Sequence, residues 1–308
     1  MRVMITGGAG FIGSHLVEAM LVDRHEVVVV DDFTTGLRDH LPDAVSMVEG
    51  SVTDMATVRR AMQGIEVVLH HAAVRAVARS VEDPVQTDQV NTGGTLNVLV
   101  AAKDAGVRRV VCASSSSVYG GAAPLPTDED AELMPKSPYA VSKVAGEHYA
   151  RVFWELYGLE TVRLRYFNVF GPRQRPDSPY AAVVPLFAQA ILEERPPEIH
   201  GDGLQSRDFT FIDDVVQANR LALAASAEAV AGNVYNIAQG ESTTILDLWK
   251  EMARIASSRL EPVFGSPRRG DVRASLASVD RAAADLAFQS QVAVREGLGR
   301  YLAWFSSR

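Results

Sequence analysis

The chain has 308 residues, of which 47% are hydrophobic, and its 30 basic and 38 acidic residues give a formal net charge of −8. This length and apolar content suffice for one large domain or two closely packed domains. The acidic balance, without a basic run, argues against nucleic acid and anionic membranes as partners. The single cysteine, Cys112, lies in an apolar run, so an intramolecular disulfide is excluded and a small core residue is predicted.

A strand, a glycine-rich turn and a helix open the chain. Apolar residues over 2–6 predict the strand, and apolar residues at helical spacing over 14–22 predict the helix. The turn between them contains Gly7, Gly10, Phe11, Ile12 and Gly13. Glycines at such a turn let the backbone approach a pyrophosphate, which the amide groups at the helix start then bind. We therefore expect this turn to bind a dinucleotide.

A second apolar strand, over 26–31, ends in Asp31 and Asp32. These acids follow the glycine-rich turn by about 20 residues, the distance expected of an acid that binds the adenosine ribose. A carboxylate there accepts hydrogen bonds from a 2′-hydroxyl and repels a 2′-phosphate. The predicted cofactor is therefore NAD rather than NADP.

Strand–helix alternation continues to about residue 168 and predicts an α/β fold, a Rossmann-type doubly wound parallel sheet covered on both faces. Further strands are expected near 65–70, 107–114 and 161–167, and helices near 54–63, 91–105 and 137–157. Beyond residue 168 the turn-rich sequence predicts a smaller, discontinuous C-terminal substrate-binding domain. We assign 1–168, with returning segments about 208–238, to the NAD-binding domain, and 169–207 and 239–308 to the substrate-binding domain.

Two motifs indicate chemistry on an alcohol proton. The serine run 114–117 follows a predicted strand, and Tyr139 and Lys143 are four residues apart on one face of a predicted helix. A lysine ammonium beside a phenol favours the phenolate and lowers the tyrosine pKa toward neutrality. Tyr139 is therefore a candidate acid/base, and the serine run offers a second hydroxyl for the same substrate oxygen.

In combination these motifs resemble the extended short-chain dehydrogenase/reductase family, and within it the UDP-sugar 4-epimerases. The resemblance extends from residue 2 to about 280 and includes segments 70–73, 91–95, 165–172 and 201–209. It implies that Tyr139 is the catalytic base, that Lys143 orients the nicotinamide ribose and that Ser115 is the catalytic hydroxyl. It also implies the reaction, in which resident NAD oxidises the sugar at C4, the 4-keto sugar turns over, and the hydride returns to the opposite face.

The resemblance assigns binding residues as well. Around the cofactor it places Ser51, Val52, Ala72 and Ala73, with Ser51 standing where an aspartate against the adenine is usual. For the nucleotide sugar it implies Asn168, Arg207, Arg268, Asp271 and Ser275. Guanidinium groups suit phosphate oxygens, and the small Ser275 leaves room for an N-acetyl group at the sugar C2.

The residues after Ser115 bear on the reaction and on the sugar. Related dehydratases carry an Asp-Glu pair where this chain has Ser116 and Ser117, and hydroxyls cannot serve as that acid/base pair at neutral pH. Interconversion of UDP-glucose and UDP-galactose, with UDP-GlcNAc and UDP-GalNAc as further substrates, is the preferred hypothesis. Arg175 with Ser116 and Ser117 suits a C6 carboxylate and leaves UDP-glucuronate 4-epimerase as an alternative. A nucleotide-sugar reductase or decarboxylase and a non-catalytic NAD-binding protein are less favoured.

The resemblance further implies a homodimer packed through the helices near 91–105 and 137–157. Their apolar residues Val98, Val144, Phe153 and Leu156 suit that interface, and equally suit packing on the sheet. We see no leader peptide and no membrane span, so we expect a cytoplasmic protein. No Cys/His cluster has ligand spacing, so no metal site is expected.

Overall fold

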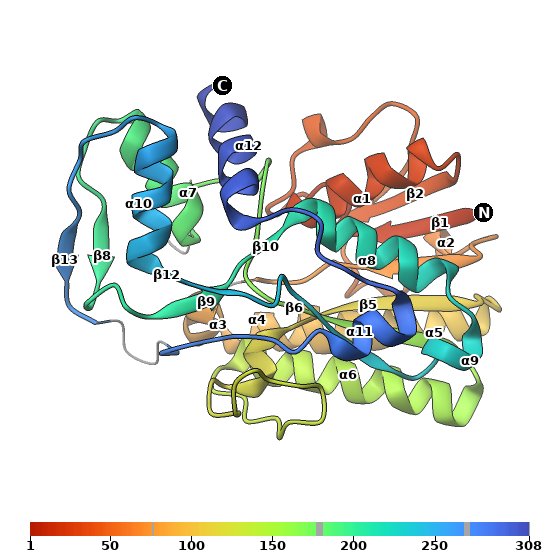
Figure 1. Cartoon of the computed structure of the whole chain (residues 1–308). Helices are drawn as coiled ribbons and strands as arrows, with labels where there is room; N and C mark the ends of the chain where they lie inside the picture. The colour runs from red at the N-terminus through yellow and green to blue at the C-terminus, as the bar shows by residue number, and fades with distance from the viewer. Residues whose placement is uncertain (76, 177–180, 268–271, 308) are drawn as a thin grey trace.

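A seven-stranded parallel sheet forms the centre of the protein (Figure 1). The computed structural model describes residues 1–75, 77–176, 181–267 and 272–307. The strand order is β11-β6-β5-β4-β1-β2-β3. The strands are β1 (Arg2–Thr6), β2 (Glu26–Asp31), β3 (Ser46–Glu49), β4 (Val67–His70), β5 (Arg109–Ser115), β6 (Glu160–Tyr166) and β11 (Val234–Ile237).

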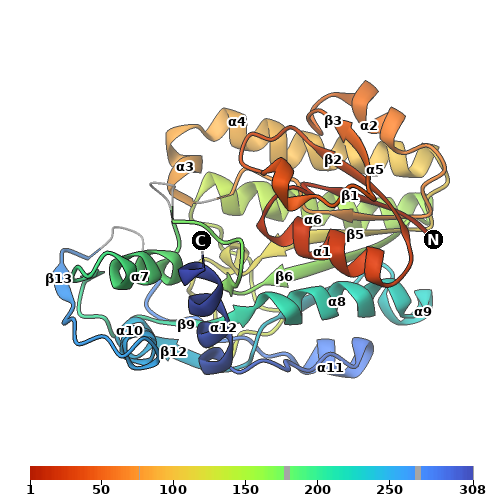
Figure 2. The same ribbon diagram turned by 90° about the horizontal axis from the view of Figure 1, so that it is seen from above.

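Helices cover both faces of this sheet (Figure 2). Those on one face are α1 (Phe11–Val22) and α8 (Ile212–Ala224), and those on the other are α2 (Met55–Ala61), α5 (Gly94–Asp104) and α6 (Pro138–Tyr157). Alternate residues of each strand face opposite sides, so Val3 and Ile5 pack with α1 whereas Met4 packs with α5. The strands are buried on both sides, which explains their continuous apolar runs.

The predicted α/β fold is confirmed, with additions. β3 and the short helices α3 (Val77–Glu82) and α4 (Pro84–Asp88) were not expected, and the helix predicted over 91–105 begins as a π-helical turn, η2 (Gln89–Gly93). β3 is a four-residue edge strand with exposed polar ends, so its sequence lacks an apolar run. The segments near 208–224 and 232–238 do return to the sheet, as α8 beside α1 and β11 beside β6.

The remaining elements gather beyond the carboxyl ends of the sheet strands, on the left of Figure 1. Three small two-stranded sheets pair β10 (Thr210–Phe211) with β7 (Val169–Phe170), β12 (Ser242–Thr244) with β9 (Ser206–Asp208) and β13 (Val263–Gly265) with β8 (Glu198–His200). The helices are α7 (Val183–Leu192), α10 (Ile245–Ile255) and α12 (Val294–Ser306), while α9 (Ala227–Val230) and α11 (Asp280–Leu286) lie beside β11 and β6. Trp249 and Leu298 belong to the same buried cluster as Val3, so both parts share one core. The domain boundaries stay a prediction.

The helices proposed for a dimer interface divide their apolar residues between inside and outside. Val98 and Phe153 are buried against the sheet, and Val144 packs beside Val118. Leu156 is 68% exposed. Only Leu156 of these four residues therefore faces outward. Among the described residues, no helix is long and apolar enough to cross a membrane.

Candidate active site

The glycine-rich turn leaves no space for side chains. Gly7 has φ of +71°, and a Cβ added to it would lie 2.8 Å from the backbone nitrogen of Ala72. A Cβ on Gly13 would lie 2.0 Å from the carbonyl oxygen of Gly7. Gly10 is the N-cap of α1, whose first turn starts with Phe11 and Ile12 and contains no acidic residue. The amide groups and positive dipole end of α1 are thus open to an anion.

Asp31 lies beside this turn at the carboxyl end of β2. Its Oδ2 accepts a hydrogen bond from the Ala9 N–H at 2.9 Å, and its Oδ1 accepts one from the Phe33 N–H at 2.9 Å. Burial raises the pKa of Asp31, and the two backbone hydrogen bonds act against it. Asp32 is exposed and accepts from the Thr34 N–H at 3.0 Å. Each Asp31 oxygen keeps a further acceptor site, so its ribose role stays a prediction.

The other expected cofactor residues follow the ends of neighbouring strands. The Ser51 hydroxyl accepts a hydrogen bond from the Thr53 hydroxyl at 3.0 Å, and Val52 is buried. The Ala72 N–H donates to the Thr6 hydroxyl at 3.1 Å, and Ala73 follows it in the same loop. A crowded glycine turn, an uncapped helix start and an acid at the end of β2 together fit NAD.

The catalytic candidates meet at the carboxyl end of β5. Ser115 ends this strand, and Tyr139 lies in the first turn of α6, where the Ser137 hydroxyl caps the helix. The Lys143 ammonium donates to the Ala113 carbonyl at 2.9 Å and lies 5.8 Å from the centre of the Tyr139 ring. The Ser115 hydroxyl is close enough to Tyr139 to act on the pKa of its phenol. The structure therefore brings together three residues that the sequence separates by up to 28 positions.

The expected lowering of the Tyr139 pKa is wrong for the protein by itself. Burial is the largest influence and raises the pKa of Tyr139, while the hydrogen bond with Ser115 and the charge of Arg75 act in the opposite direction. Burial also lowers the pKa of Lys143 to about 8. Lys143 thus carries its charge at neutral pH and loses it in mildly alkaline solution.

Two residues in or near the site were not predicted as site residues. Arg75, in the loop after β4, is close enough for its charge to act on Tyr139 and for the charge of Arg175 to act on it. No sequence pattern points to it. Asn91 accepts from the Val74 N–H at 2.8 Å and donates to the Ser142 hydroxyl at 3.0 Å, so it joins the same loop to α6. In the sequence, Asn91 stands shortly before the paired glycines Gly93 and Gly94, and this spacing alone does not indicate the role of Asn91.

Ser116 and Ser117 begin the short helix η3 (Ser116–Tyr119). The Ser117 N–H donates to the Ser115 hydroxyl at 3.2 Å. The Ser117 hydroxyl is buried and makes no hydrogen bond to any described residue. A buried hydroxyl without a partner is costly, so this one is suited to a ligand. Arg175, half-buried in the loop after β7, is close enough for its charge to act on Arg75.

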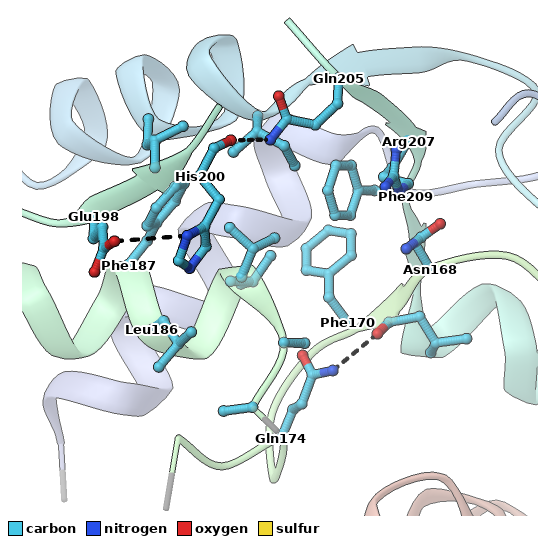
Figure 3. Close-up of a pocket in the computed structure, with 17 residues that line it drawn as sticks. Asn168, Phe170, Gln174, Leu186, Phe187, Glu198, His200, Gln205, Arg207 and Phe209 are labelled. Carbon is cyan, nitrogen blue, oxygen red and sulfur yellow. Dashed lines mark hydrogen bonds and ion pairs between the residues drawn. The ribbon is translucent and has the colours of Figure 1, made fainter. Parts of the chain in front are cut away.

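A pocket of about 320 Å³ opens between α7, β8, β9 and the β7 loop (Figure 3). Phe170, Phe187 and Phe209 line its apolar part, with Asn168 and Arg207 together at one end and His200 at the other. The backbone here is held by side chains: Gln174 donates to the Val169 carbonyl at 3.0 Å, and Gln205 donates to the His200 carbonyl at 2.7 Å. An elongated pocket with a cation at one end suits a nucleoside diphosphate.

Of the remaining predicted substrate residues, Ser275 is described and lies on the segment beside β9. Arg268 and Asp271 fall outside the described residues. Ser275 donates its N–H to the Ser206 carbonyl at 3.1 Å, and its hydroxyl accepts from the Asp208 N–H at 3.4 Å. Ser275 thus packs next to the strand that carries Arg207. In the described part of the chain, no group of His, Cys, Asp and Glu is arranged to hold a metal ion.

Comparisons with known proteins agree on one family. The chain matches the model described as NAD dependent epimerase/dehydratase family over residues 3–238. It is 39% identical to the UDP-glucose 4-epimerase of Mycolicibacterium smegmatis, covering 100% of this chain and 99% of that protein. UDP-glucose 4-epimerase with UDP-glucose from Thermotoga maritima aligns with a TM-score of 0.96 at 35% identity, covering 100% and 99% of the chains. UDP-glucuronic acid 4-epimerase from Bacillus cereus, with UDP-glucuronic acid and NAD, aligns at 0.91 and 31%, with coverage of 100% and 99%.

Proposed function

We propose that this chain, which belongs to the NAD dependent epimerase/dehydratase family, inverts C4 of a sugar carried on UDP. The observation that carries the proposal is the meeting of Ser115, Tyr139 and Lys143 at the carboxyl end of β5. Hydroxyl and ammonium groups at this place suit proton transfer to and from a sugar hydroxyl. The glycine-rich turn and the pocket near Arg207 supply the two binding sites that the reaction needs.

The mechanism divides among these residues. NAD bound at the glycine-rich turn supplies the group that takes the hydride from the sugar C4 and returns it. Tyr139 removes the proton of the 4-hydroxyl, and Ser115 hydrogen-bonds the same oxygen. Because burial raises the pKa of Tyr139, its phenolate depends on neighbouring positive charge. The charge of Arg75 acts on Tyr139, and the Lys143 ammonium lies 5.8 Å from the centre of its ring. Asn168 and Arg207 hold the nucleotide, which leaves the 4-keto sugar free to present its other face.

A panel of UDP-sugars tests this function. Purified protein should invert C4 of UDP-galactose or UDP-GalNAc without added cofactor, as followed by proton NMR. Tyr139→Phe should abolish inversion while UDP binding persists, because the phenyl ring keeps its shape and loses the proton acceptor. Inversion by the variant would contradict the role of Tyr139. A wild-type protein that inverts none of the panel, including UDP-galacturonate, would contradict the function.

The preferred substrates are UDP-glucose and UDP-galactose. Ser275 supports UDP-GlcNAc and UDP-GalNAc as further substrates, because its small side chain lies beside β9 with its hydroxyl bonded to backbone. UDP-glucuronate is the second candidate. The charge of Arg75 acts on Tyr139 and that of Arg175 acts on Arg75, and the Ser117 hydroxyl is buried without a partner among the described residues. These groups suit a carboxylate at C6.

Arg175→Met separates the two candidates. If a C6 carboxylate is bound there, the variant should raise KM for UDP-galacturonate by about tenfold or more, since a charge-assisted hydrogen bond contributes about 1.5–3 kcal/mol. KM for UDP-galactose should stay unchanged. Arg79→Met is the matched control, because Arg79 lies on α3 and donates to Gln86 at 3.3 Å. Equal KM values of wild type and Arg175→Met for UDP-galacturonate would exclude this carboxylate contact.

We also propose a homodimer that packs through α6. Val141, Val152 and Leu156 are exposed along one side of this helix, and an apolar stripe of this kind is typical of an interface. Wild-type protein should have the mass of a dimer in light scattering, and Leu156→Asp should reduce it to a monomer. Val22→Asp, at the exposed end of α1 on the opposite face of the sheet, should remain a dimer. A monomeric wild type would refute this interface.

A further inference from the structure

A buried charged side chain lies directly behind the catalytic group. Tyr139, Lys143 and Glu147 occupy successive turns on one face of α6. The Glu147 carboxylate accepts a hydrogen bond from the Ser114 hydroxyl, and Ser114 is the neighbour of Ser115 on β5. Glu147 thus contacts the strand end that carries Ser115 and lies on the helix that carries Tyr139 and Lys143.

Arg165 on β6 completes this arrangement. It binds Glu147 through two hydrogen bonds, from Nε at 2.9 Å and from Nη2 at 2.7 Å. Its Nη1 donates to the Tyr119 hydroxyl at 2.8 Å and to the Glu129 carbonyl at 3.0 Å. Both members of the Glu147–Arg165 pair are buried. Burial removes hydration from both charges, so such a pair adds little net stability compared with apolar residues, and a role in positioning is a better account of it.

The other titratable groups that face Lys143 are neutral near pH 7. His70 and His71, at the end of β4, have their pKa lowered to about 3 by burial. Cys112 on β5 has its thiol pKa raised to about 12 by burial. Tyr139 is a neutral phenol, because burial raises its pKa. These four groups therefore provide no negative charge to Lys143 at neutral pH.

Glu147 provides the negative charge. Burial lowers the pKa of Lys143, and Cys112 and then Glu147 act against burial. Because the Cys112 thiol is neutral near pH 7, the negative charge that opposes burial there is the Glu147 carboxylate. From β6, Arg163 and Arg165 bring two positive charges toward Glu147. Removing the carboxylate would leave Lys143 near these two guanidinium groups, and its ammonium form would be less favoured.

We propose that Glu147 is a positioning residue for the C4 inversion: it keeps Lys143 charged and, through Ser114, fixes the strand end that carries Ser115. This inference rests on the proposed function for its catalytic consequence, although the charge of Lys143 can be measured without turnover. Without Glu147 the Lys143 ammonium loses its proton at lower pH. The phenolate of Tyr139 then loses its neighbouring positive charge, and the alkaline limb of the kcat profile moves to lower pH.

The test compares Glu147→Gln with Glu129→Gln. Glu129 belongs to the same buried group, since its carboxylate accepts from the Asn236 N–H at 2.7 Å and its carbonyl accepts from Arg165 Nη1, but it is not among the groups that act on the pKa of Lys143. Both variants should unfold at lower urea concentration. Only Glu147→Gln should shift the alkaline limb of kcat to lower pH, with KM for the UDP-sugar nearly unchanged.

A direct measurement accompanies the kinetics. The chain has only four lysines, Lys103, Lys136, Lys143 and Lys250, so NMR of protein labelled with ¹³C-lysine resolves each side chain, and Lys143→Arg identifies the signal of Lys143. In wild type this signal should titrate near pH 8, because burial lowers the pKa of Lys143 to about 8. Glu147→Gln should move it further down, and Glu129→Gln should leave it in place. An unchanged Lys143 titration in folded Glu147→Gln would overturn the proposal.

Glu147→Asp covers the case in which Glu147→Gln does not fold. The shorter carboxylate keeps its charge but withdraws from Ser114, so kcat should fall while the Lys143 titration stays close to that of wild type. A wild-type kcat in Glu147→Asp, or a Lys143 titration that moves although the carboxylate is kept, would overturn the proposal. If wild type inverts no UDP-sugar, the proposed function fails, whereas the lysine titration still decides the role of Glu147.

Discussion

Gly13→Ala places two physical effects in opposition. Gly13 lies in α1, and replacing a helical glycine by alanine ordinarily stabilises a protein by about 1 kcal/mol. Here the new Cβ would lie 2.0 Å from the Gly7 carbonyl oxygen and 2.8 Å from the Gly8 Cα. Ordinary contacts of carbon atoms are about 3.5 Å or longer, so backbone must move by roughly 1 Å. Overpacking of this kind costs about 1–3 kcal/mol, which exceeds the gain in helix propensity.

The same displacement opens the turn that we expect to bind the pyrophosphate. We predict a free energy of unfolding lower than that of wild type by up to about 2 kcal/mol and an NAD affinity lower by at least about tenfold, equivalent to 1.4 kcal/mol. Urea unfolding and calorimetric titration with NAD measure these quantities. Gly299→Ala is the control, because Gly299 lies within α12 and its added Cβ meets nothing within 4 Å. The reasoning fails if both variants are stabilised alike, or if Gly13→Ala binds NAD as wild type does.

Three further predictions concern buried groups. Arg109→Ala should destabilise the protein by about 3–5 kcal/mol in urea unfolding, because it leaves Glu160, 2.6 Å from Arg109, without its buried partner. Burial raises the pKa of Asp208 from 3.8 to about 6, so the ionised form is disfavoured in the folded state. The stability of wild type relative to Asp208→Asn should therefore fall by up to about 3 kcal/mol as pH rises from 4 to 7. Burial also raises the pKa of the Cys112 thiol to about 12, so a thiol reagent should modify native protein only as fast as it unfolds; rapid native labelling would contradict this.

Local spacing in the sequence predicted the sheet, which is confirmed, and the candidate catalytic residues, which lie together in the structure. The strand, turn, helix and acid of residues 2–31 lie within one unit of the fold, and Tyr139 and Lys143 lie on one helix. The edge strand β3 was not predicted, because its four residues contain no apolar run. The direction of the Tyr139 pKa shift could not be predicted for a different reason. The sequence indicates which charged residues lie near Tyr139, but not how far burial removes its hydration. Burial has a larger effect on the Tyr139 pKa than the neighbouring charge has.

Glu147 and Arg165 show what spacing cannot disclose. They are 18 positions apart on α6 and β6 and meet only because α6 packs across β5 and β6. A sequence reader sees an acid on an amphipathic helix and a base on a strand, both of which are usually assigned to solvent. The predicted strand itself argues against a solvent-exposed Arg165. A strand in the middle of a parallel sheet, as β6 is, is buried on both faces, and a charged side chain there needs a partner. The helix that crosses β6 carries Lys143 one turn before Glu147, so the partner of Arg165 is also a negative charge that acts on Lys143, the candidate catalytic lysine.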